Sequence, residues 1–591
     1  MFSYIFMKIL ESRPSRYDKG INILTGGHAK RIKRKIVDRW IRPGLEILDI
    51  GCGTGELLEL AARAGARVSG IDISEGMLSV AQNRIKKIEA LGKNKLYHAG
   101  VIELDRLFDD KSFDVVTSTL VFSELYTAER QWAYTEIRRI LHDSGLFILA
   151  GEVRPNSIVK RFLHFLVRLP LAIVTYFIAQ TGTRAVPDMA GELTRAGFEV
   201  LGEQRSLLES FSVVWARKKL VTPVEKPAET LITGSDQDIS FIRTVWDYTG
   251  RWFPCPVEPG LRKIGMPGKD APVFVTCNFH LTVRRVEKAL SAMNAWLLIA
   301  PTSGINVWCA SCGGVLTAHS VTSVLKTSGI SKKILHRHIV LPQLSASGID
   351  IQKLKKVTGF NAVFGPAYAR DIPEYMEKKE RKSRNMCLAD FSLRFRLEML
   401  LSMNAVIWFT IAAIILAVRP ALLWKFSLLF WGAGAVLYTG YPWLPGDSGW
   451  LKGFGLGILI IIGISFEITP SSIKIGFDHW GWMISVLIVC FWLGFDLRGI
   501  VEGSPSEAEK FIEKLGLHSF GKLYSSNSKS TGVLHYDTAL CSQCHTCINV
   551  CPKGVFGFTD GEKDLKPVHP EACFTCGACV CQCPEGALKI S

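Results

Sequence analysis

The chain has 591 residues, with 70 Lys and Arg against 54 Asp and Glu, so its formal net charge is +16. This length is too great for one hydrophobic core, and about 150 residues per domain suggests about four domains. A hydrophobic content of 48% with a mean hydropathy of +0.20 is high for a soluble protein and indicates a membrane portion. A basic chain can bind nucleic acid, but we find no basic array interleaved with aromatic residues and no helix-turn-helix pattern. We therefore expect no nucleic-acid partner.

The first part of the chain alternates strand-like and helix-like patterns. The segment LEILDIGCGTGELLEL (45–60) predicts an apolar strand, a glycine-rich turn and then a helix. Gly51, Gly53 and Gly55 let the backbone approach a ligand closely. The next strand ends near Asp72, where a carboxylate can hold ribose hydroxyls. These residues predict a nucleotide-cofactor pocket, and the glycines alone leave a dinucleotide open as its ligand.

Further motifs narrow the choice of cofactor. Asp49 precedes the glycines, and the segments SFDVVTSTLVFSEL (112–125) and IRRILHDSGLFILAGE (137–152) follow them. This set resembles the class I S-adenosylmethionine-dependent methyltransferases, in particular the quinone-methyltransferase-like branch, over residues 14–218. The resemblance implies a Rossmann-like fold. It also implies that S-adenosylmethionine is held by Asp49, Gly51, Gly53, Gly55 and Asp72.

The resemblance also implies an acidic contact to adenine after the third strand. The segment HAGVIELD offers two candidates there, Glu103 and Asp105. No residue predicts a catalytic base, so the methyl acceptor of this domain stays open.

A second alternating region follows a stretch rich in Pro, Thr and acidic residues (219–238), which predicts a linker. Between about 239 and 395, strand–helix alternation predicts a parallel α/β sheet. The predicted strands lie at 272–278, 295–300, 338–344 and 361–366.

Four apolar segments follow the basic run EKKERKSRN (377–385). They lie at about 399–418, 421–440, 453–466 and 481–495. They predict about four transmembrane helices within 397–497, although the last two are short for a roughly 20-residue span, and buried core helices are the alternative. An even number of spans behind a basic run predicts a multi-pass inner-membrane protein with both soluble ends in the cytoplasm. Arg419 and Lys425 in the first short turn argue against that orientation.

After a polar linker (498–530), the tail (531–591) contains nine of the 16 cysteines. They form two C-x2-C-x2-C-x3-C-P runs that are typical of a small α+β ferredoxin with two [4Fe–4S] clusters. In that pattern, each cluster takes three thiolates from one run and the fourth from the other. The predicted ligands are Cys541, Cys544, Cys547 and Cys583 for one cluster, and Cys573, Cys576, Cys579 and Cys551 for the other. A zinc site is the alternative, and Cys581 is expected to be a small apolar filler.

The segment GINVWCASCGG (304–314) places Trp308, Cys309 and Cys312 where an apolar strand gives way to a helix. A thiolate at a helix N-terminus is favoured by the helix dipole and the exposed amides. Beside a methyl-donor pocket and a low-potential electron source, it suggests a corrinoid, because Co(I) accepts a methyl cation and needs reductive rescue after oxidation. A Cys309–Cys312 redox pair and simple packing remain alternatives.

Longer segments carry a second resemblance. VEPGLRKIGMPGKDAPVFVTCNFHLTVRRVEKAL (257–290), NAWLLIAPTSGINVWCA and HIVLPQLSASGIDIQKLKKVTGFNAVFGP look like the corrinoid protein of microbial mercury methylation (HgcA-like), in the corrinoid iron–sulfur protein superfamily. The tail resembles its two-cluster ferredoxin partner (HgcB-like). The resemblance implies that Cys309 is the lower axial cobalt ligand. The matching cap-helix residues are Asn306, Val307, Trp308, Cys309 and Ala310.

The match to the cap-helix motif stops after Ala310. Cys312 stands where the family has Gly, and Gly313 stands where it has Lys. The family's ferredoxin also carries further cysteines beyond its second cluster motif, whereas eight residues follow Cys583 here. For Cys312 three roles stay open, a spare thiol near cobalt, a mercury-handling thiol and a small buried residue, and we expect the last.

These motifs together predict a membrane-anchored, corrinoid-dependent methyltransferase. The methyl donor would be S-adenosylmethionine or a methyl-folate enzyme, the tail clusters would pass on electrons of low potential, and Hg(II) would be the acceptor. Another metalloid or one-carbon acceptor, a membrane redox module, and an independent methylation of a small molecule such as a quinone are the alternatives. The remaining thiols and imidazoles are expected to be core, surface or structural groups: Cys255, Cys277, His280, His319, His336 and His338.

Overall fold

The computed structural model describes most of the chain. The described residues are 27–86, 94–155, 185–207, 209–219, 231–232, 241–249, 256–445, 448–467, 477–495, 532–558 and 564–591, with a few isolated residues between them. The polar linker expected at 498–530, most of the linker expected at 219–238, and Cys255 lie outside these residues.

The first domain is built on a seven-stranded sheet in the order β3-β2-β1-β4-β5-β7-β6. The first five strands are parallel, and β7 runs antiparallel to both β5 and β6. This doubly wound order confirms the expected Rossmann-like fold. The strands are β1 (Glu46–Ile50), β2 (Arg67–Asp72), β3 (Lys95–His98), β4 (Phe113–Thr119), β5 (Leu141–Glu152), β6 (Phe198–Ser206) and β7 (Phe211–Lys218).

Helices cover both faces of this sheet, because its parallel strands are apolar on both sides. One core lies under α3, α4 and α5, and the other lies under α6, α7 and α9. The helices are α3 (His28–Trp40), α4 (Glu56–Arg63), α5 (Glu75–Lys86), α6 (Leu104–Leu107), α7 (Thr127–Ile140) and α9 (Met189–Arg195), with 3-10 turns η2 (Val101–Glu103) and η3 (Val121–Ser123).

The second domain has a six-stranded sheet in the order β13-β12-β10-β11-β9-β8. All four strands expected from the sequence are confirmed, and they are parallel. The strands are β8 (Leu231–Ile232), β9 (Gly260–Ile264), β10 (Val273–Cys277), β11 (Ala295–Ala300), β12 (His338–Leu341) and β13 (Asn361–Phe364).

The sheet is nevertheless mixed rather than wholly parallel. β9 runs antiparallel to β11, and β8, from within the stretch expected to be a linker, pairs with β9. The sequence hides β9 because Arg262 and Lys263 interrupt its apolar pattern. The helices around this sheet are α10 (Phe241–Thr249), α11 (His280–Leu290), α12 (Val307–Cys312), α13 (Ala318–Thr327), α14 (Ile351–Thr358), α15 (Ile372–Glu377) and α16 (Arg384–Cys387), with 3-10 turns η4 (Ile330–Lys332), η5 (Gln343–Ser345) and η6 (Ala369–Asp371).

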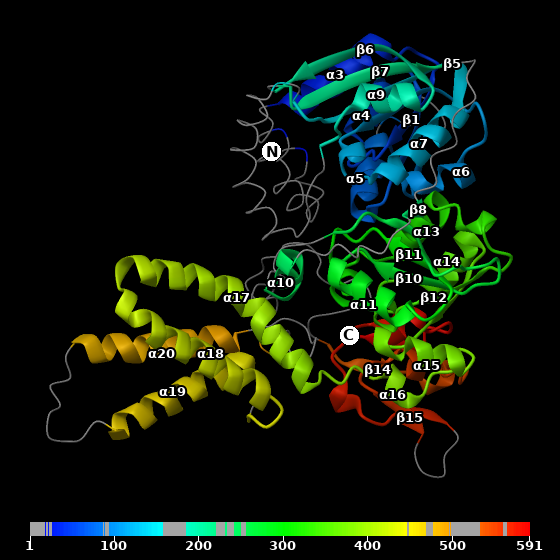
Figure 1. The fold of residues 1–591 in the computed structure, drawn as a ribbon. Helices are drawn as coiled ribbons and strands as arrows, with labels where there is room; N and C mark the ends of the chain where they lie inside the picture. The colour runs from blue at the N-terminus through cyan, green and yellow to red at the C-terminus, as the bar shows by residue number, and fades with distance from the viewer. Residues whose placement is uncertain are drawn as a thin grey trace.

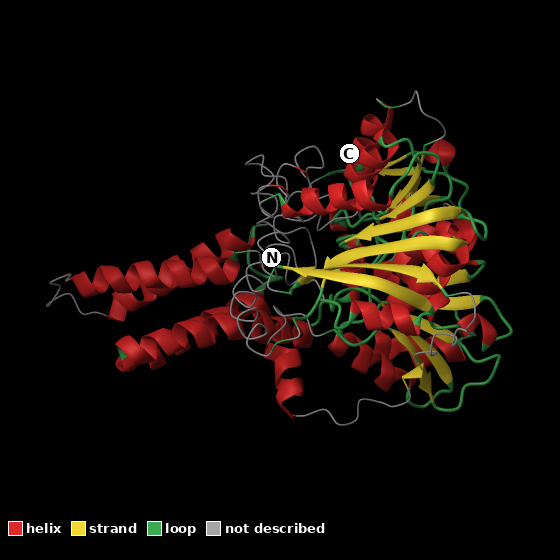
Figure 2. Ribbon diagram, turned by 90° about the horizontal axis from the view of Figure 1, so that it is seen from above, coloured by secondary structure: helices red, strands yellow, loops and turns green. Residues whose placement is uncertain are grey.

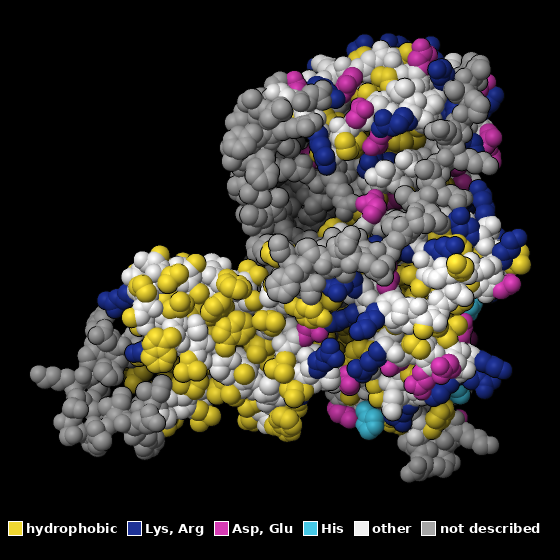
Figure 3. Space-filling view, in the orientation of Figure 1, with side chains coloured by type: hydrophobic (Ala, Val, Ile, Leu, Met, Phe, Trp, Pro, Cys, Tyr) yellow, Lys and Arg dark blue, Asp and Glu magenta, His cyan; other side chains and the backbone are white. Residues whose placement is uncertain are grey.

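Four apolar helices project together from the side of the soluble domains (Figures 1 and 2). They are α17 (Leu393–Val418), α18 (Leu423–Gly440), α19 (Gly449–Glu467) and α20 (Phe477–Gly494), with the 3-10 turn η7 (Pro420–Leu422) between the first two. Hydrophobic side chains cover the visible face of this projection, whereas charged side chains dot the other domains (Figure 3). Large exposed apolar residues on it include Phe409, Trp424, Leu428, Leu459 and Ile488.

By length and composition, two segments among the described residues can cross a membrane, Leu393–Val418 and Pro420–Gly440. The other two apolar stretches are shorter, Gly449–Gly463 and Trp480–Gly494. These helices give support for a membrane association.

The tail forms a small α+β unit beside the second domain (Figure 1). Its two antiparallel pairs are β14 with β17 and β15 with β16. One hydrophobic core runs without a break from the second domain into the tail. The elements are β14 (Leu534–Tyr536), α23 (Thr546–Val550), β15 (Phe556–Phe558), β16 (Leu565–Pro567), α24 (Ala578–Gln582) and β17 (Leu588–Ile590), with 3-10 turns η9 (Thr538–Leu540) and η10 (Pro570–Ala572).

Candidate functional site

The glycine-rich turn predicted in the first domain lies between β1 and α4. Gly51, Gly53 and Gly55 all have positive φ angles, of 70°, 53° and 78°. A Cβ atom on Gly51 would lie 2.0 Å from Cγ2 of Val121, whereas a Cβ on Gly53 would meet nothing within 4 Å. At position 51, glycine is therefore required both by the positive φ angle and by the lack of room for a Cβ atom. At position 53, only the φ angle requires glycine.

Two carboxylates lie beside this turn. Asp49, the residue before the last of β1, is buried and accepts a hydrogen bond of 2.7 Å from the hydroxyl of Thr117. Asp72 ends β2 and accepts the backbone N–H of Gly53 at 2.8 Å. Burial raises the pKa of Asp49 to about 7, against the lowering effects of the Thr117 hydrogen bond and of Lys33. A cationic cofactor such as S-adenosylmethionine would favour the ionised form of Asp49, so the chemistry of this pocket fits that cofactor.

The two candidates for an adenine contact both lie against the second domain. Lys326 of α13 donates to Asp105 at 2.6 Å and to the carbonyl of Ile102 at 3.0 Å. Glu103 lies 3.9 Å from His319 of α13. Although burial acts to raise it, hydrogen bonds from His319 and the Gly100 amide lower the pKa of Glu103 to about 2. The loop after β3 is thus part of an interface between domains.

A second part of that interface centres on Asn278, which directly follows β10 and is fully buried. Its amide nitrogen donates to the hydroxyl of Tyr126, after β4 of the first domain, at 2.9 Å. Its amide oxygen accepts from the backbone N–H of Thr302 at 3.0 Å and of Gly304 at 2.9 Å. Thr302 and Gly304 begin the loop that leads to Cys309. One side chain therefore connects the methyltransferase-like domain to the cap loop.

These contacts bring together the carboxyl ends of strands from the two sheets. Tyr126 follows β4, and Asn278 follows β10. In open α/β sheets, ligands bind in the crevice at that edge. The two predicted cofactor sites therefore lie on facing edges of neighbouring domains.

The short helix α12 holds the predicted cobalt ligand. Asn306 caps it, because its side-chain oxygen accepts the backbone N–H of Cys309 at 3.0 Å, and its side-chain nitrogen lies 3.4 Å from the Cys309 sulfur. Cys309 is exposed, whereas Val307 and Ala310 are buried. An outward-facing sulfur oriented by an amide fits an axial thiolate ligand of a corrinoid.

Cys312, the departure from the family motif, is buried as expected. Its sulfur lies 3.5 Å from the hydroxyl of Ser347. Burial and the nearby charge of Cys312 hold the pKa of Cys576 well above the ordinary value of a thiol.

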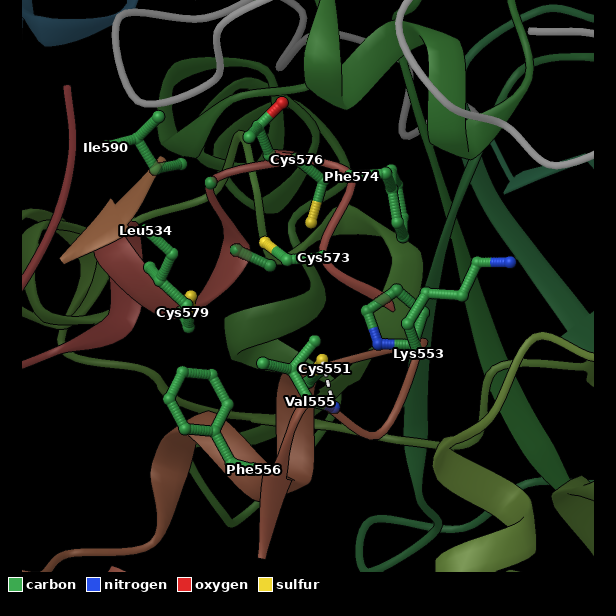
Figure 4. A pocket seen from close by; sticks show the side chains of 14 residues that line it. Leu534, Cys551, Lys553, Val555, Phe556, Cys573, Phe574, Cys576, Cys579 and Ile590 are labelled. Atoms are coloured by element: carbon green, nitrogen blue, oxygen red, sulfur yellow. Dashed lines mark hydrogen bonds between the residues drawn. The ribbon is translucent and has the colours of Figure 1, made fainter. Parts of the chain in front are cut away.

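Eight of the nine tail cysteines line two cavities. One cavity, called the inner cavity here, is lined by Cys551, Cys573, Cys576 and Cys579 (Figure 4). The other, the outer cavity, is lined by Cys541, Cys544, Cys547 and Cys583. Each cavity takes three cysteines from one run and one from the other, which is the grouping that the spacing predicts.

Four sulfurs around each cavity suit a cube of four irons, because every thiolate of such a cluster binds a different iron. Burial raises the pKa of Cys573 and Cys551, and raises that of Cys547 to about 12. Thiols in such surroundings lose their protons when a metal neutralises the charge. Among the described residues, no three His, Cys, Asp or Glu side chains lie close enough for a single metal ion.

The inner cavity adjoins the cap helix. Phe574, between Cys573 and Cys576, stacks on Trp308 with ring centroids 5.3 Å apart and an interplanar angle of 23°. Gln582 of α24 donates to the carbonyl oxygens of Ala346 and Ile349 in the second domain, both at 2.7 Å. The tail is thus seated next to the helix that carries Cys309.

Several residues of the site gave no signal in the sequence. In the sequence, Asn278 is only a polar residue at the end of a predicted strand. Tyr126 follows the 112–125 motif and does not belong to it. The pairing of Trp308 with Phe574 joins residues 266 positions apart, which local spacing does not predict. The imidazole of His280 pairs with the carboxylate of Asp247 at 2.8 Å and is buried, as expected of a structural group.

Comparisons with known families match three parts of the chain. Residues 48–149 match a methyltransferase domain, residues 217–376 match the CO dehydrogenase/acetyl-CoA synthase delta subunit, and residues 540–588 match a 4Fe-4S dicluster domain. The chain therefore carries, in order, a region similar to a methyltransferase domain, a region similar to that delta subunit and a region similar to a 4Fe-4S dicluster domain.

Curated relatives resemble only part of the chain. The gamma subunit of the acetyl-CoA decarbonylase/synthase complex from Archaeoglobus fulgidus is 38% identical over 134 residues, which are 22% of this chain and 28% of that protein. Its counterpart from Methanopyrus kandleri is 34% identical over 134 residues, 22% of this chain and 29% of that protein. The chain thus covers less than a third of the length of these relatives.

Solved structures resemble about a third of the chain. A SAM-dependent methyltransferase from Methanosarcina mazei is 25% identical, covering 32% of this chain and 98% of that one, with a TM-score of 0.26. A cyclopropane synthase from Mycobacterium tuberculosis is 19% identical, covering 31% and 64%, also with a TM-score of 0.26. Scores of this size carry no argument about function.

Proposed function

We propose that this chain is a membrane-anchored, corrinoid-dependent methyltransferase whose acceptor is Hg(II), which it converts to methylmercury. One observation carries the proposal: the exposed thiol of Cys309 lies on the short helix α12, and this helix and the loop before it contact both other soluble domains. Asn278 joins that loop to Tyr126 of the methyltransferase domain, and Trp308 joins the helix to Phe574 of the tail. A methyl source and an electron source thus flank one predicted cobalt ligand.

Each cofactor has residues that would hold it. Asp49, Asp72 and the glycine turn would bind S-adenosylmethionine, Cys309 would bind the corrinoid through its thiolate, and the two cavities would hold two [4Fe–4S] clusters. When bound, a corrinoid supplies a cobalt centre that, once reduced, accepts a methyl cation and passes it to a soft acceptor. The protein contributes the orientation of Cys309, which Asn306 fixes through the helix cap and the amide beside the sulfur.

S-adenosylmethionine as the methyl donor is favoured by the facing edges of the two sheets. Its sulfonium methyl is an electrophile, which suits transfer to a reduced cobalt nucleophile. The buried link from Tyr126 to Asn278 keeps the domains together, which raises the effective concentration of donor and acceptor. A methyl-folate enzyme in solution would instead need access to Cys309 from outside.

The proposed acceptor rests on the resemblance of the cap helix and tail to the mercury-methylation pair. Hg(II) is a soft ion, and electron density from the Cys309 thiolate would favour departure of the methyl group toward it. A carbon acceptor is the second candidate, because the curated relatives are subunits of acetyl-CoA decarbonylase/synthase complexes. Cys312 and Gly313, where the family has Gly and Lys, are the positions that distinguish this chain from the mercury pair.

The apolar helices support an inner-membrane location with four spans and cytoplasmic soluble ends. α19 and α20 pack very closely, because a Cβ atom on Gly453 would lie 2.2 Å from the carbonyl oxygen of Cys490. Small residues that allow such close approach are typical of helix contacts in membranes. Arg285 of α11 pairs with Glu398 of α17 at 2.6 Å, which anchors the helices to the second domain.

The test begins with metal and ultraviolet–visible analysis of the anaerobically purified chain, where we expect about eight irons and one cobalt. Radiolabelled S-adenosylmethionine is then added, followed by Hg(II). Labelled methylmercury supports the whole proposal. Label on the corrinoid without methylmercury would exclude Hg(II) as the acceptor, and turnover without cobalt would mean an independent small-molecule methyltransferase.

A further inference from the structure

The residue after the first cysteine differs between the two cysteine runs, and in the second run this residue contacts the cap helix. The first run reads C-S-Q-C-H-T-C and the second reads C-F-T-C-G-A-C. Phe574 of the second run therefore takes the place of Ser542 in the first. Phe574 lines the inner cavity and stacks on Trp308, the residue before Cys309. An aromatic pair thus connects one of the two cavities directly to the proposed cobalt ligand.

Other contacts hold the inner cavity in this position. Gln582, just before Cys583, is buried and anchored by two hydrogen bonds of 2.7 Å to the second domain. Lys382 of the second domain donates to the carbonyl oxygen of Asn549, next to Val550 and Cys551. The Trp308–Phe574 stack and the hydrogen bonds of Gln582 and Lys382 therefore hold the inner cavity against the second domain.

The outer cavity has a more exposed setting. Cys544 is exposed, and Leu540, just before Cys541, is exposed as well. Tyr536 lines this cavity. Phe558 does not line it but packs edge-on against His545 of the first run, with ring centroids 5.2 Å apart, and is half exposed. The outer cavity thus lies on the solvent side of the tail, and the inner cavity lies on the side of the second domain.

We propose that the cluster of the inner cavity is the direct electron donor to the corrinoid, through the stacked rings of Phe574 and Trp308, and that the outer cluster receives electrons first. This inference rests on the proposed function. In each transfer the reduced inner cluster would lose one electron and the cobalt would gain it, going from Co(II) to Co(I). No covalent bond of the protein chain would form or break, the cobalt could release the Cys309 thiolate on reduction, and no proton would move. The outer cluster then re-reduces the inner one, and a soluble low-potential one-electron carrier supplies the outer cluster.

The experiment uses the full chain, purified in detergent, with its clusters and a Co(II) corrinoid bound. The clusters are reduced with titanium(III) citrate, and cobalt reduction is followed by stopped-flow absorption. We expect Phe574→Leu to slow cobalt reduction by about tenfold, equivalent to about 1.4 kcal/mol of activation free energy. Phe574→Trp keeps an aromatic ring and should restore most of the rate. Phe558→Leu removes a ring of the same size elsewhere in the tail and should leave the rate unchanged.

A second readout does not depend on the corrinoid. Electron paramagnetic resonance of the corrinoid-free protein should give the same cluster content and midpoint potentials in Phe574→Leu as in wild type, which would exclude a merely structural effect. With Co(II) corrinoid bound, magnetic coupling between cobalt and a reduced cluster should persist in Cys544→Ser and be lost in Cys576→Ser. The reverse pattern, or a Phe574→Leu rate equal to wild type, would overturn the inference. A wild-type chain that binds corrinoid but never forms Co(I) would overturn the proposed function, and this inference with it.

Discussion

The two α/β domains place their predicted sites at the same edge of the sheet but build them from different chemistry. In the first domain, the turn after β1 uses backbone and carboxylates: glycines with positive φ beside Asp49 and Asp72. In the second, the loop after β11 offers one exposed sulfur, Cys309, on a short capped helix. The sheet topology decides where a ligand lies, and the loop residues decide which ligand it is. Four predictions test this contrast, from the largest expected effect to the smallest.

Gly51→Ala should have the largest effect. A residue with a Cβ atom at this left-handed backbone position loses roughly 1–2 kcal/mol of stability. The overlap with Val121 adds about 1–3 kcal/mol, as overpacking does. We expect calorimetry to detect no binding of S-adenosylmethionine to this variant. Its cobalt and iron contents should equal those of the wild type.

Gly53→Ala is the matched control, because it has a similar φ but open space around its Cβ. It should weaken binding only by the backbone cost, roughly 1–2 kcal/mol. Equal losses in both variants would show that Val121 does not limit the turn.

Cys309→Ala should lower the rate of methyl transfer by about 100-fold. Mutating a residue that only hydrogen-bonds to a metal ligand already lowers activity by up to about 100-fold, and Cys309 is the proposed ligand itself. The corrinoid should stay bound with an altered absorption spectrum, because its axial thiolate is gone. Cys312→Ala is the control: a buried sulfur contributes packing, so we expect about 1 kcal/mol less stability and an unchanged spectrum. Full activity in Cys309→Ala would contradict the axial role.

Asn278→Ala should separate the two domains functionally. It leaves the buried N–H groups of Thr302 and Gly304 without their acceptor, at about 1–3 kcal/mol each. Methyl transfer from S-adenosylmethionine to the corrinoid should fall, whereas methylation of the corrinoid by methyl iodide in solution should not. Tyr126→Phe removes only the hydrogen bond between domains and should cost about 0.5–1.5 kcal/mol. Equal effects on both methyl donors would contradict a role for this link in transfer.

The smallest effect concerns pH. The pKa of Asp49 is raised to about 7 in the folded protein, from 3.8, chiefly by burial. The folded state therefore binds an extra proton between these values, so this group's contribution to stability is present below about pH 4 and is lost as pH rises through about 7. The cationic cofactor needs the carboxylate, so its affinity should fall by about tenfold per pH unit below pH 7. Asp49→Asn should flatten that profile in a titration from pH 5.5 to 8, within about one unit of the expected midpoint.

Local patterns predicted much of this molecule. The glycine turn, the four parallel strands of the second sheet and the four apolar helices follow from hydrophobic periodicity and glycine spacing. The assignment of the eight tail cysteines to two sets of four also matches the two cavities. β9 escaped prediction because two basic residues interrupt its apolar pattern, and the antiparallel pairing of an edge strand is not encoded in its own sequence.

The sequence by itself determined which chemical groups the protein carries: a glycine turn with two carboxylates, a thiol on a cap helix, and two runs of cluster-forming cysteines. Only the tertiary structure decided how these groups meet. The Tyr126–Asn278 link, the stack of Trp308 on Phe574 and the hydrogen bonds of Gln582 to Ala346 and Ile349 all join residues more than 150 positions apart. Such contacts depend on how separately formed cores pack against one another, and the spacing of residues along the chain does not record that packing.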